Sequence, residues 1–182
     1  MLGIILLVVV ALLVVWAIAS YNRLIGMRNQ VLNGWRQIDV QLKRRHDLIP
    51  NLVETVKGYA AHERGTFEAV TAARANAINA QSPAEQAQAE NVLSGALKSL
   101  FAVAEAYPDL KANQNFLNLQ EELTSAEDRV AYARQFYNDS VFKYNAKIQS
   151  FPGVIFANVM GFKPREYFEA DDESRGPVRV EF

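Results

Sequence analysis

The order of apolar and polar side chains follows a helical period over most of the chain beyond residue 30. Apolar residues recur at alternating steps of four and three, the spacing of the buried face of a helix in a bundle or coiled coil. The pattern loosens after the first such seam, and Gln81-Ser82-Pro83 would interrupt a helix, so a first soluble helix is predicted from Tyr21 to Ala80. This seam comprises Val31, Trp35, Ile38, Leu42, Arg45, Ile49, Leu52, Val56 and Tyr59.

Pro50 lies inside this predicted helix. A proline lacks the N–H that would bond the carbonyl four residues earlier, and its ring crowds that carbonyl. The sequence therefore predicts a kink near Pro50 and a free carbonyl oxygen at His46. Asn115, Asn138 and Asn145, on or beside a later seam, could bind that carbonyl or fix the register between helices.

A second and a third long helix are predicted beyond the breaker. Ser82 can cap the second helix, with Pro83 in its first turn and Glu85 completing a capping box. Apolar positions again step by four and three over residues 93–107, and Pro108 ends that helix. The third seam runs from Phe116 to Ile148 and ends near Ser150, before a short apolar helix from Val154 to Met160.

No stretch before residue 163 alternates with the period of two that a half-buried strand shows. The predicted fold class is therefore all-α. An N-terminal transmembrane helix continues into an elongated antiparallel bundle of three long helices and a short fourth. The predicted division is an anchor at residues 1–20, a helical bundle at 21–162 and an acidic C-terminal tail at 163–182.

Residues 2–19 contain no charged side chain. Eighteen helical residues span about 27 Å, close to the roughly 30 Å hydrocarbon core of a bilayer, so this run is predicted to contact membrane lipid as a single span. Trp16 and Tyr21 stand at its distal end, where aromatic side chains favour the interface. A cleaved signal peptide is the alternative, because Ala17-Ile18-Ala19 resembles a cleavage site, but no basic residue precedes the apolar run.

Basic residues follow the predicted span, beginning with Arg23, Arg28 and Arg36. The positive-inside rule then places the bulk of the chain in the cytoplasm, beyond a very short N-terminus on the outside. Residues 23–81 carry nine basic and five acidic side chains, whereas residues 85–162 carry six basic and nine acidic ones. These opposite balances suit antiparallel pairing of the first helix with the later two.

The first predicted helix is longer than its partners, so its membrane-proximal end could lack an intrachain partner. Val31, Trp35, Ile38 and Leu42 lie there and are candidates for self-association into a homo-oligomer. The alternative is that the third helix and the short apolar helix cover this part of the seam.

Arg45 is expected to have a carboxylate partner, because an unpaired charge at a seam position would be costly. The basic triplet Lys43-Arg44-Arg45 could pair with acids of the third helix, namely Glu121, Glu122, Glu127 or Asp128. Binding to anionic lipid is the alternative for the triplet. His46 and Pro50, close to Arg45, are assigned structural roles.

The composition argues against several classes of protein. There are no cysteines, only two histidines and a net charge of −1, which excludes thiol chemistry and disfavours nucleic-acid binding. No phosphate-binding, dinucleotide-binding, zinc-protease or hydrolase motif is present. His46-Asp47 and His62-Glu63 would lie about 24 Å apart on one helix, so they cannot share a metal ion and no metal site is predicted. No cofactor, small-molecule substrate or enzymatic activity is predicted either.

The end of the chain alternates apolar residues at Val178, Val180 and Phe182. Such a segment could add a strand to the sheet edge of a membrane protein partner or to a neighbouring copy of this chain. The alternative is a disordered tail.

The stretch NGWRQIDVQLKRRHDLIPNLVETVKGY, residues 33–59, resembles the LemA family of bacterial membrane-anchored helical proteins. Nearly the whole chain shares the resemblance, although His46 stands where the family more often has Tyr. Further matches are His62-Glu63, residues 105–113, Phe116-Leu117, Tyr137-Asn138, Tyr144-Asn145, Phe151-Pro152 and residues 161–163.

The resemblance implies an antiparallel helical bundle on one N-terminal anchor, with no established enzymatic activity and no cofactor. A relative with this domain takes part in magnetosome membrane formation, which points to membrane organisation. The leading hypothesis is therefore a non-enzymatic, self-associating membrane scaffold. The alternative is a monomeric adaptor that recruits a partner through its tail or an acidic helix face.

Overall fold

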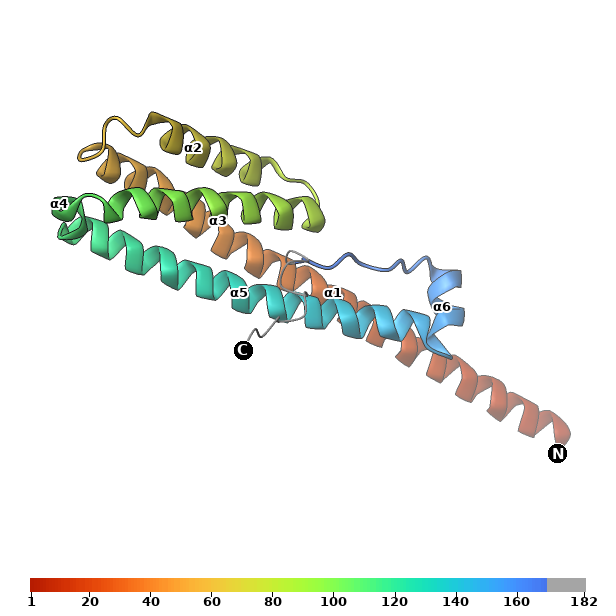
Figure 1. Ribbon diagram of the computed structural model, residues 1–182. Helices are drawn as coiled ribbons and strands as arrows, with labels where there is room; N and C mark the ends of the chain where they lie inside the picture. The colour runs from red at the N-terminus through yellow and green to blue at the C-terminus, as the bar shows by residue number, and fades with distance from the viewer. Residues whose placement is uncertain (170–182) are drawn as a thin grey trace, which may run out of the picture.

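The computed structural model describes residues 1–169, and the regular secondary structure of that part is entirely helical (Figure 1). The predicted all-α fold class is confirmed. The helices are α1 (Leu2–Lys57), α2 (Arg64–Asn79), α3 (Pro83–Glu105), α4 (Pro108–Lys111), α5 (Gln114–Gln149) and α6 (Gly153–Met160).

Helix α1 joins the apolar N-terminal segment to the bundle without a break. It is 56 residues long, and its apolar window has a mean hydropathy of 3.2 with no residue buried against the rest of the chain. Its length and composition suffice to cross a membrane. The N-terminal end of α1 projects beyond all other helices (Figure 1), so any membrane crossed there would lie at one end of the bundle.

The predicted continuation of the first helix to Ala80 is wrong. Helix α1 ends at Lys57, where the N–H groups of Tyr59 and Ala60 both bond the carbonyl of Val56. The chain reverses over residues 58–63 and returns as α2. The physical reason is burial: the returning helix places Phe67, Val70, Ala73 and Ala77 inside the bundle, whereas a straight continuation would leave that face in water.

The free carbonyl predicted at His46 is confirmed, but its partner differs from the asparagines considered. Helix α1 continues through Pro50, and Nε of Arg74, on α2, donates to the His46 oxygen at 2.7 Å. The missing helical hydrogen bond is thereby replaced by one between two helices. The fold-back of α2 therefore also satisfies the carbonyl that the proline leaves free.

Helices α1 and α5 lie antiparallel along most of their lengths, and the α2–α3 hairpin packs at the end far from the N-terminus (Figure 1). The two long helices approach closely at Gly34, where a Cβ atom would lie 3.2 Å from Cα of Tyr137. The predicted start of α3 is also confirmed, since the Ser82 hydroxyl accepts from the Glu85 N–H at 3.2 Å.

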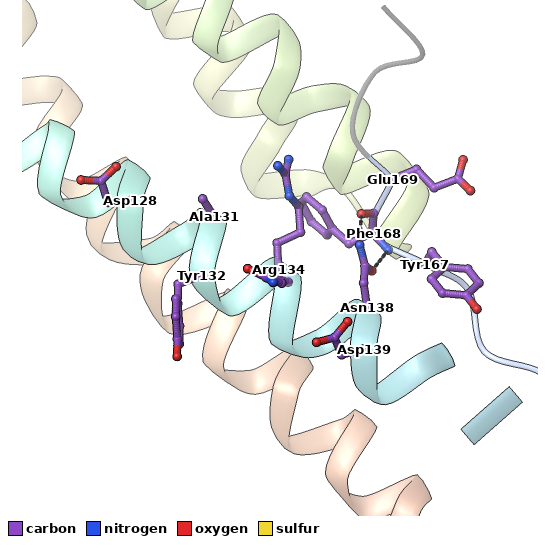
Figure 2. A pocket seen from close by; sticks show the side chains of 10 residues that line it. Asp128, Ala131, Tyr132, Arg134, Asn138, Asp139, Tyr167, Phe168 and Glu169 are labelled. Atoms are coloured by element: carbon purple, nitrogen blue, oxygen red, sulfur yellow. Dashed lines mark hydrogen bonds between the residues drawn. The ribbon is translucent and has the colours of Figure 1, made fainter. Parts of the chain in front are cut away.

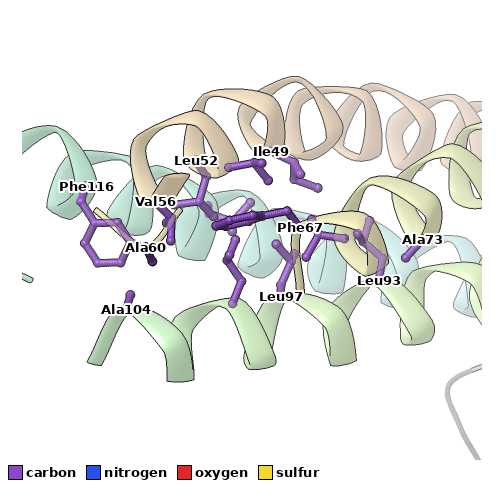
Figure 3. Close-up of a cluster of buried hydrophobic side chains, with 14 of the residues drawn as sticks. Ile49, Leu52, Val56, Ala60, Phe67, Ala73, Leu93, Leu97, Ala104 and Phe116 are labelled. Carbon is purple, nitrogen blue, oxygen red and sulfur yellow. The ribbon is translucent and has the colours of Figure 1, made fainter. Parts of the chain in front are cut away.

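The buried side chains form two separate clusters. The distal core lies among α1, α2, α3 and α5 and includes Ile49, Val56, Phe67, Leu97 and Phe116 (Figure 3). The proximal core, nearer the N-terminus, is built mainly from α1 and α5 and comprises Leu24, Val31, Ile38, Leu42, Ala87, Ala133, Tyr137, Val141, Tyr144, Ile148, Ala157 and Phe168. Two helices alone cannot enclose a core, so further segments must complete the proximal one.

Candidate functional site

A charged network occupies the junction between the two cores. The Arg45 guanidinium donates to Glu90 at 2.6 Å, to Glu127 at 2.6 Å and to Ser94 at 2.7 Å. Nε2 of His46 lies 2.7 Å from the other oxygen of Glu90. Arg45, His46 and Glu90 are all buried. The expected carboxylate partner of Arg45 is therefore present, supplied by α3 as well as by α5.

This network ties α1, α3 and α5 together at one level of the bundle. Gln86 extends it, donating to Glu90 at 3.0 Å and to the Ala77 carbonyl at 2.9 Å. Removing one member would leave a buried charge without its partner, which is strongly destabilising. Within residues 1–169 no three potential ligands gather to hold a metal ion. The geometry suits holding the helices in register.

An extended segment after α6, residues 163–168, lies along α5 and is called the strap. Two asparagines of α5 clamp its backbone. The Asn145 side chain accepts from the Arg165 N–H at 2.9 Å and donates to the Arg165 carbonyl at 2.8 Å. Asn138 makes the same pair of bonds with Phe168, both at 2.9 Å. Each amide thus pairs with the strap as a neighbouring strand would.

Two tyrosines of α5 add hydrogen bonds to the strap. The Tyr144 hydroxyl donates to the Lys163 carbonyl at 3.0 Å, and the Tyr137 hydroxyl donates to the Glu166 carbonyl at 2.8 Å. Burial raises the pKa of both tyrosines, an effect opposed by the positive charge of Arg165. The phenols therefore stay protonated, as donors must.

The spacing of the clamps follows from backbone geometry. Asn138 and Asn145 are seven residues apart, which is about 10.5 Å along a helix. Phe168 and Arg165 are three residues apart, which is about 10 Å along an extended chain. The dipeptide Tyr-Asn occurs at both 137–138 and 144–145, and this repeat is the sequence signal that could have revealed the clamp.

The strap also completes the proximal core. Phe168 is buried, and its ring lies 6.2 Å from that of Trp35, which in turn lies 5.6 Å from Tyr137. Residues 163–168, assigned from sequence to the acidic tail, are therefore packed against the bundle.

A groove of about 730 Å³ opens on α5 beside the strap. Figure 2 shows Asn138 bonded to the backbone of Phe168 at one side of it. The lining includes three acids, Asp128, Asp139 and Glu169, and one cation, Arg134. The charged side chains that line the groove are therefore mostly acidic, as the hypothesis of an acidic docking face requires.

The predicted self-association residues have partners within the chain. Val31, Ile38 and Leu42 are buried in the proximal core, and Trp35 is packed against Tyr137 and Phe168. The premise that this seam lacks an intrachain partner is wrong, because α5 and the strap cover it. The alternative reading, in which the third helix covers the seam, is the one observed.

The predicted partner-binding residues of the C-terminal tail are not among the described residues. Val178, Val180 and Phe182 fall outside the described residues, so their assignment to partner binding stays a prediction.

Comparison with known proteins identifies relatives over most of the chain. The sequence model of the LemA family matches residues 34–182. Magnetosome protein MamQ 2 of Paramagnetospirillum magneticum is 27% identical over 184 residues, covering 87% of this chain and 68% of the relative. Magnetosome protein MamQ of Magnetospirillum gryphiswaldense is 26% identical with the same coverage.

Protein LemA of Metamycoplasma hominis is 29% identical over 134 residues, covering 71% of this chain and 60% of the relative. None of these names is the name of an enzyme. Together with the apolar half of α1, the comparisons support a membrane-associated helical protein.

Proposed function

Because the chain belongs to the LemA family, we propose that it is a non-enzymatic scaffold that self-associates on a membrane and organises the membrane or its complexes. The observation that carries the proposal is the continuity of α1, one helix from Leu2 to Lys57. A continuous helix fixes the bundle at a set angle to its anchor. The lateral surfaces of bundles anchored in one bilayer would then face one another.

The proposed setting is the bacterial inner membrane, crossed once by residues 2–19 with the bulk of the chain in the cytoplasm. Arg23, Arg28 and Arg36 support this orientation, since no acid lies between the span and Asp39. The magnetosome names of the MamQ relatives support a role at a membrane.

Self-association requires a surface other than the buried seam. Exposed apolar side chains on α1 and α5 provide candidates, namely Val40, Tyr132 and Phe142, which are 62%, 79% and 63% exposed. A charge placed at Ile38 would instead disrupt the proximal core, because that side chain is fully buried.

The proposal is tested by the mass of the full-length protein in mild detergent, corrected for bound detergent. A discrete assembly of several copies is expected. The chain has no cysteine, so single cysteines at Val40, Tyr132 and Phe142 can report contacts between copies by disulfide formation. Val92→Cys, similarly exposed on α3, is the matched control. A monomer at all concentrations contradicts the scaffold.

The second candidate is a monomeric adaptor, favoured by the acidic groove beside the strap. Such a groove suits a basic segment of a membrane partner. Deleting residues 174–182 should abolish retention of a partner that binds the tail, whereas Asp139→Lys should abolish binding to the groove. Retention by both variants counts against the adaptor.

A further inference from the structure

We infer that α6, together with Phe151, forms a second membrane contact, an interfacial helix lying in the surface of the anionic bilayer that α1 crosses. This inference rests on the membrane anchoring in the proposed function and is independent of self-association. Its partner is a lipid surface that contains acidic headgroups.

The first observation is the position of α6. Pro152 and Gly153, at its start, line a small cavity of about 240 Å³ together with Trp16, Ala19 and Ser20 of α1. Just after its end, the Phe162 ring lies 6.0 Å from that of Tyr21. Both ends of α6 therefore lie at the level where α1 leaves the predicted hydrocarbon core, and Figure 1 shows α6 turned across the end of α5.

The second observation is the outward face of α6. Ile155 and Val159 are four residues apart on α6, which places them on one side of the helix, and Phe151 lies in the turn just before it. Phe151, Ile155 and Val159 are 80%, 53% and 81% exposed, and the helix contains no charged residue. On the opposite side, Ala157 is buried in the proximal core. A helix that packs with one face on the bundle normally turns polar residues outward, whereas this one turns out Ile155 and Val159, with Asn158 as its exposed polar residue.

The third observation is charge. The chain carries no acid over residues 20–38 or over residues 140–163. The basic residues of these two stretches near the membrane exit are Arg23, Arg28, Lys143, Lys147 and Lys163. A basic rim around an apolar patch matches an anionic bilayer, whose headgroups attract Lys and Arg while its acyl region receives the apolar side chains.

Gly153 is required for this placement. A Cβ at residue 153 would fall on the carbonyl oxygen of Lys147, which lies in the last turn of α5. The glycine lets α6 turn sharply off the end of α5 instead of continuing along the α5 axis toward the membrane. The strap then returns from α6 along α5, so the segment is held on both sides.

The test uses the full-length chain in nanodiscs that each hold one copy, made of phosphatidylcholine and phosphatidylglycerol. The absence of native cysteine allows Val159→Cys and Ile155→Cys to be labelled with an environment-sensitive fluorophore. Lipids with a nitroxide high on the acyl chain are expected to remove most of the fluorescence at both positions. Val92→Cys and Val40→Cys, exposed valines on α3 and α1, should lose none.

Charge is tested by Lys143→Glu, an exposed substitution outside the apolar stripe. It should weaken quenching at Val159 in discs with phosphatidylglycerol and leave it unchanged in discs of phosphatidylcholine alone. Helical circular dichroism equal to that of the parent shows that each variant is folded. Quenching at Val159 that Lys143→Glu leaves unchanged in discs with phosphatidylglycerol overturns the role of the basic rim.

Water-like, unquenched emission at residues 155 and 159 overturns the inference. So does a signal that appears only when two copies share a disc, because the face would then contact a second copy. A monomer in detergent that shows quenching at Val159 supports the lipid contact and contradicts the scaffold. An oligomer that shows no quenching supports the scaffold and contradicts the lipid contact.

Discussion

The distal and proximal cores solve the same problem, burial of the seam of α1, by different means. In the distal core, helices on every side cover the seam, and the contacts are nearly all apolar. In the proximal core, α5 covers one side only, and the extended strap and α6 close the rest. The strap is held by hydrogen bonds from four side chains of α5 to its backbone.

The two regions therefore depend on different interactions. Apolar burial is non-directional and tolerates small shifts, whereas side-chain hydrogen bonds to a backbone require correct distance and angle. The charged network of Arg45 and Glu90 stands between the two cores and depends on both.

The largest effect is expected at the junction. Glu90→Ala leaves Arg45 buried without its fully buried partner and should lower the free energy of unfolding by about 3–5 kcal/mol. Urea unfolding followed by circular dichroism measures it. Glu127→Ala, whose side chain is 48% exposed, is the control and should cost about 1 kcal/mol or less. Equal losses from both substitutions would contradict the distinction.

A smaller effect, confined to the proximal region, is expected from the clamp. Asn138→Ala removes both side-chain bonds to Phe168 and should cost about 1.5 kcal/mol locally, equivalent to about tenfold faster exchange of the Phe168 amide. Hydrogen exchange with mass spectrometry measures it. Amides of the distal core should be unaffected, and Asn118→Ala, exposed on the same helix, is the control. Unchanged exchange at Phe168 would show that the clamp does not hold the strap.

Alanine at two helical glycines should have opposite effects in the two regions. Gly34→Ala places a methyl 3.2 Å from the Tyr137 backbone, and forcing α1 from α5 should destabilise by about 1 kcal/mol. Gly95→Ala, in α3 with no atom nearby, should stabilise by about 0.5–1 kcal/mol through helix propensity. Thermal unfolding of both variants measures the difference. Stabilisation by Gly34→Ala would mean that the helices separate at little cost.

The smallest effect concerns pH. Because the folded-state pKa of Tyr137 and of Tyr144 is raised by burial, the stabilisation from these phenols is complete below the ordinary tyrosine pKa of 10.0. It is lost as pH rises through the higher folded values, since each phenolate can no longer donate to the strap. Tryptophan fluorescence of a Trp16→Phe variant, in which Trp35 is the remaining tryptophan, measures the change between pH 9 and 12, from about one unit below that pKa to about two units above it. Tyr144→Phe should reduce the change in fluorescence with pH. A titration curve identical to that of the parent would contradict the role of the Tyr144 phenol in holding the strap.

The helices themselves could be predicted well from sequence, because their causes are local. The four-and-three spacing of Leu93, Leu97 and Leu100 places them on one face wherever that helix lies. The Ser82 cap and the free carbonyl at His46 likewise depend on residues at most four positions away. The need of Arg45 for a carboxylate also follows from its seam position alone.

The site could be predicted only in part. The asparagines were recognised as structural, but their partners are backbone groups of residues 165 and 168, some twenty to thirty positions away. An extended segment that pairs with helix side chains has no hydrophobic period, so pattern analysis assigned it to the tail. Likewise, Glu90 was not among the acids considered for Arg45, because the sequence does not show which residue of the second helix lies level with that arginine.

The apolar N-terminal segment, the helical class and the position of each seam follow from the amino-acid sequence, since these depend on side-chain order and on hydrogen bonds within a few residues. Tertiary structure alone decided that the chain reverses after Lys57, that Arg74 bonds the His46 carbonyl, and that the strap and α5 cover the membrane-proximal seam. The reason is that each of these outcomes selects one partner among several chemically equivalent ones. Only the distances across the folded bundle distinguish them.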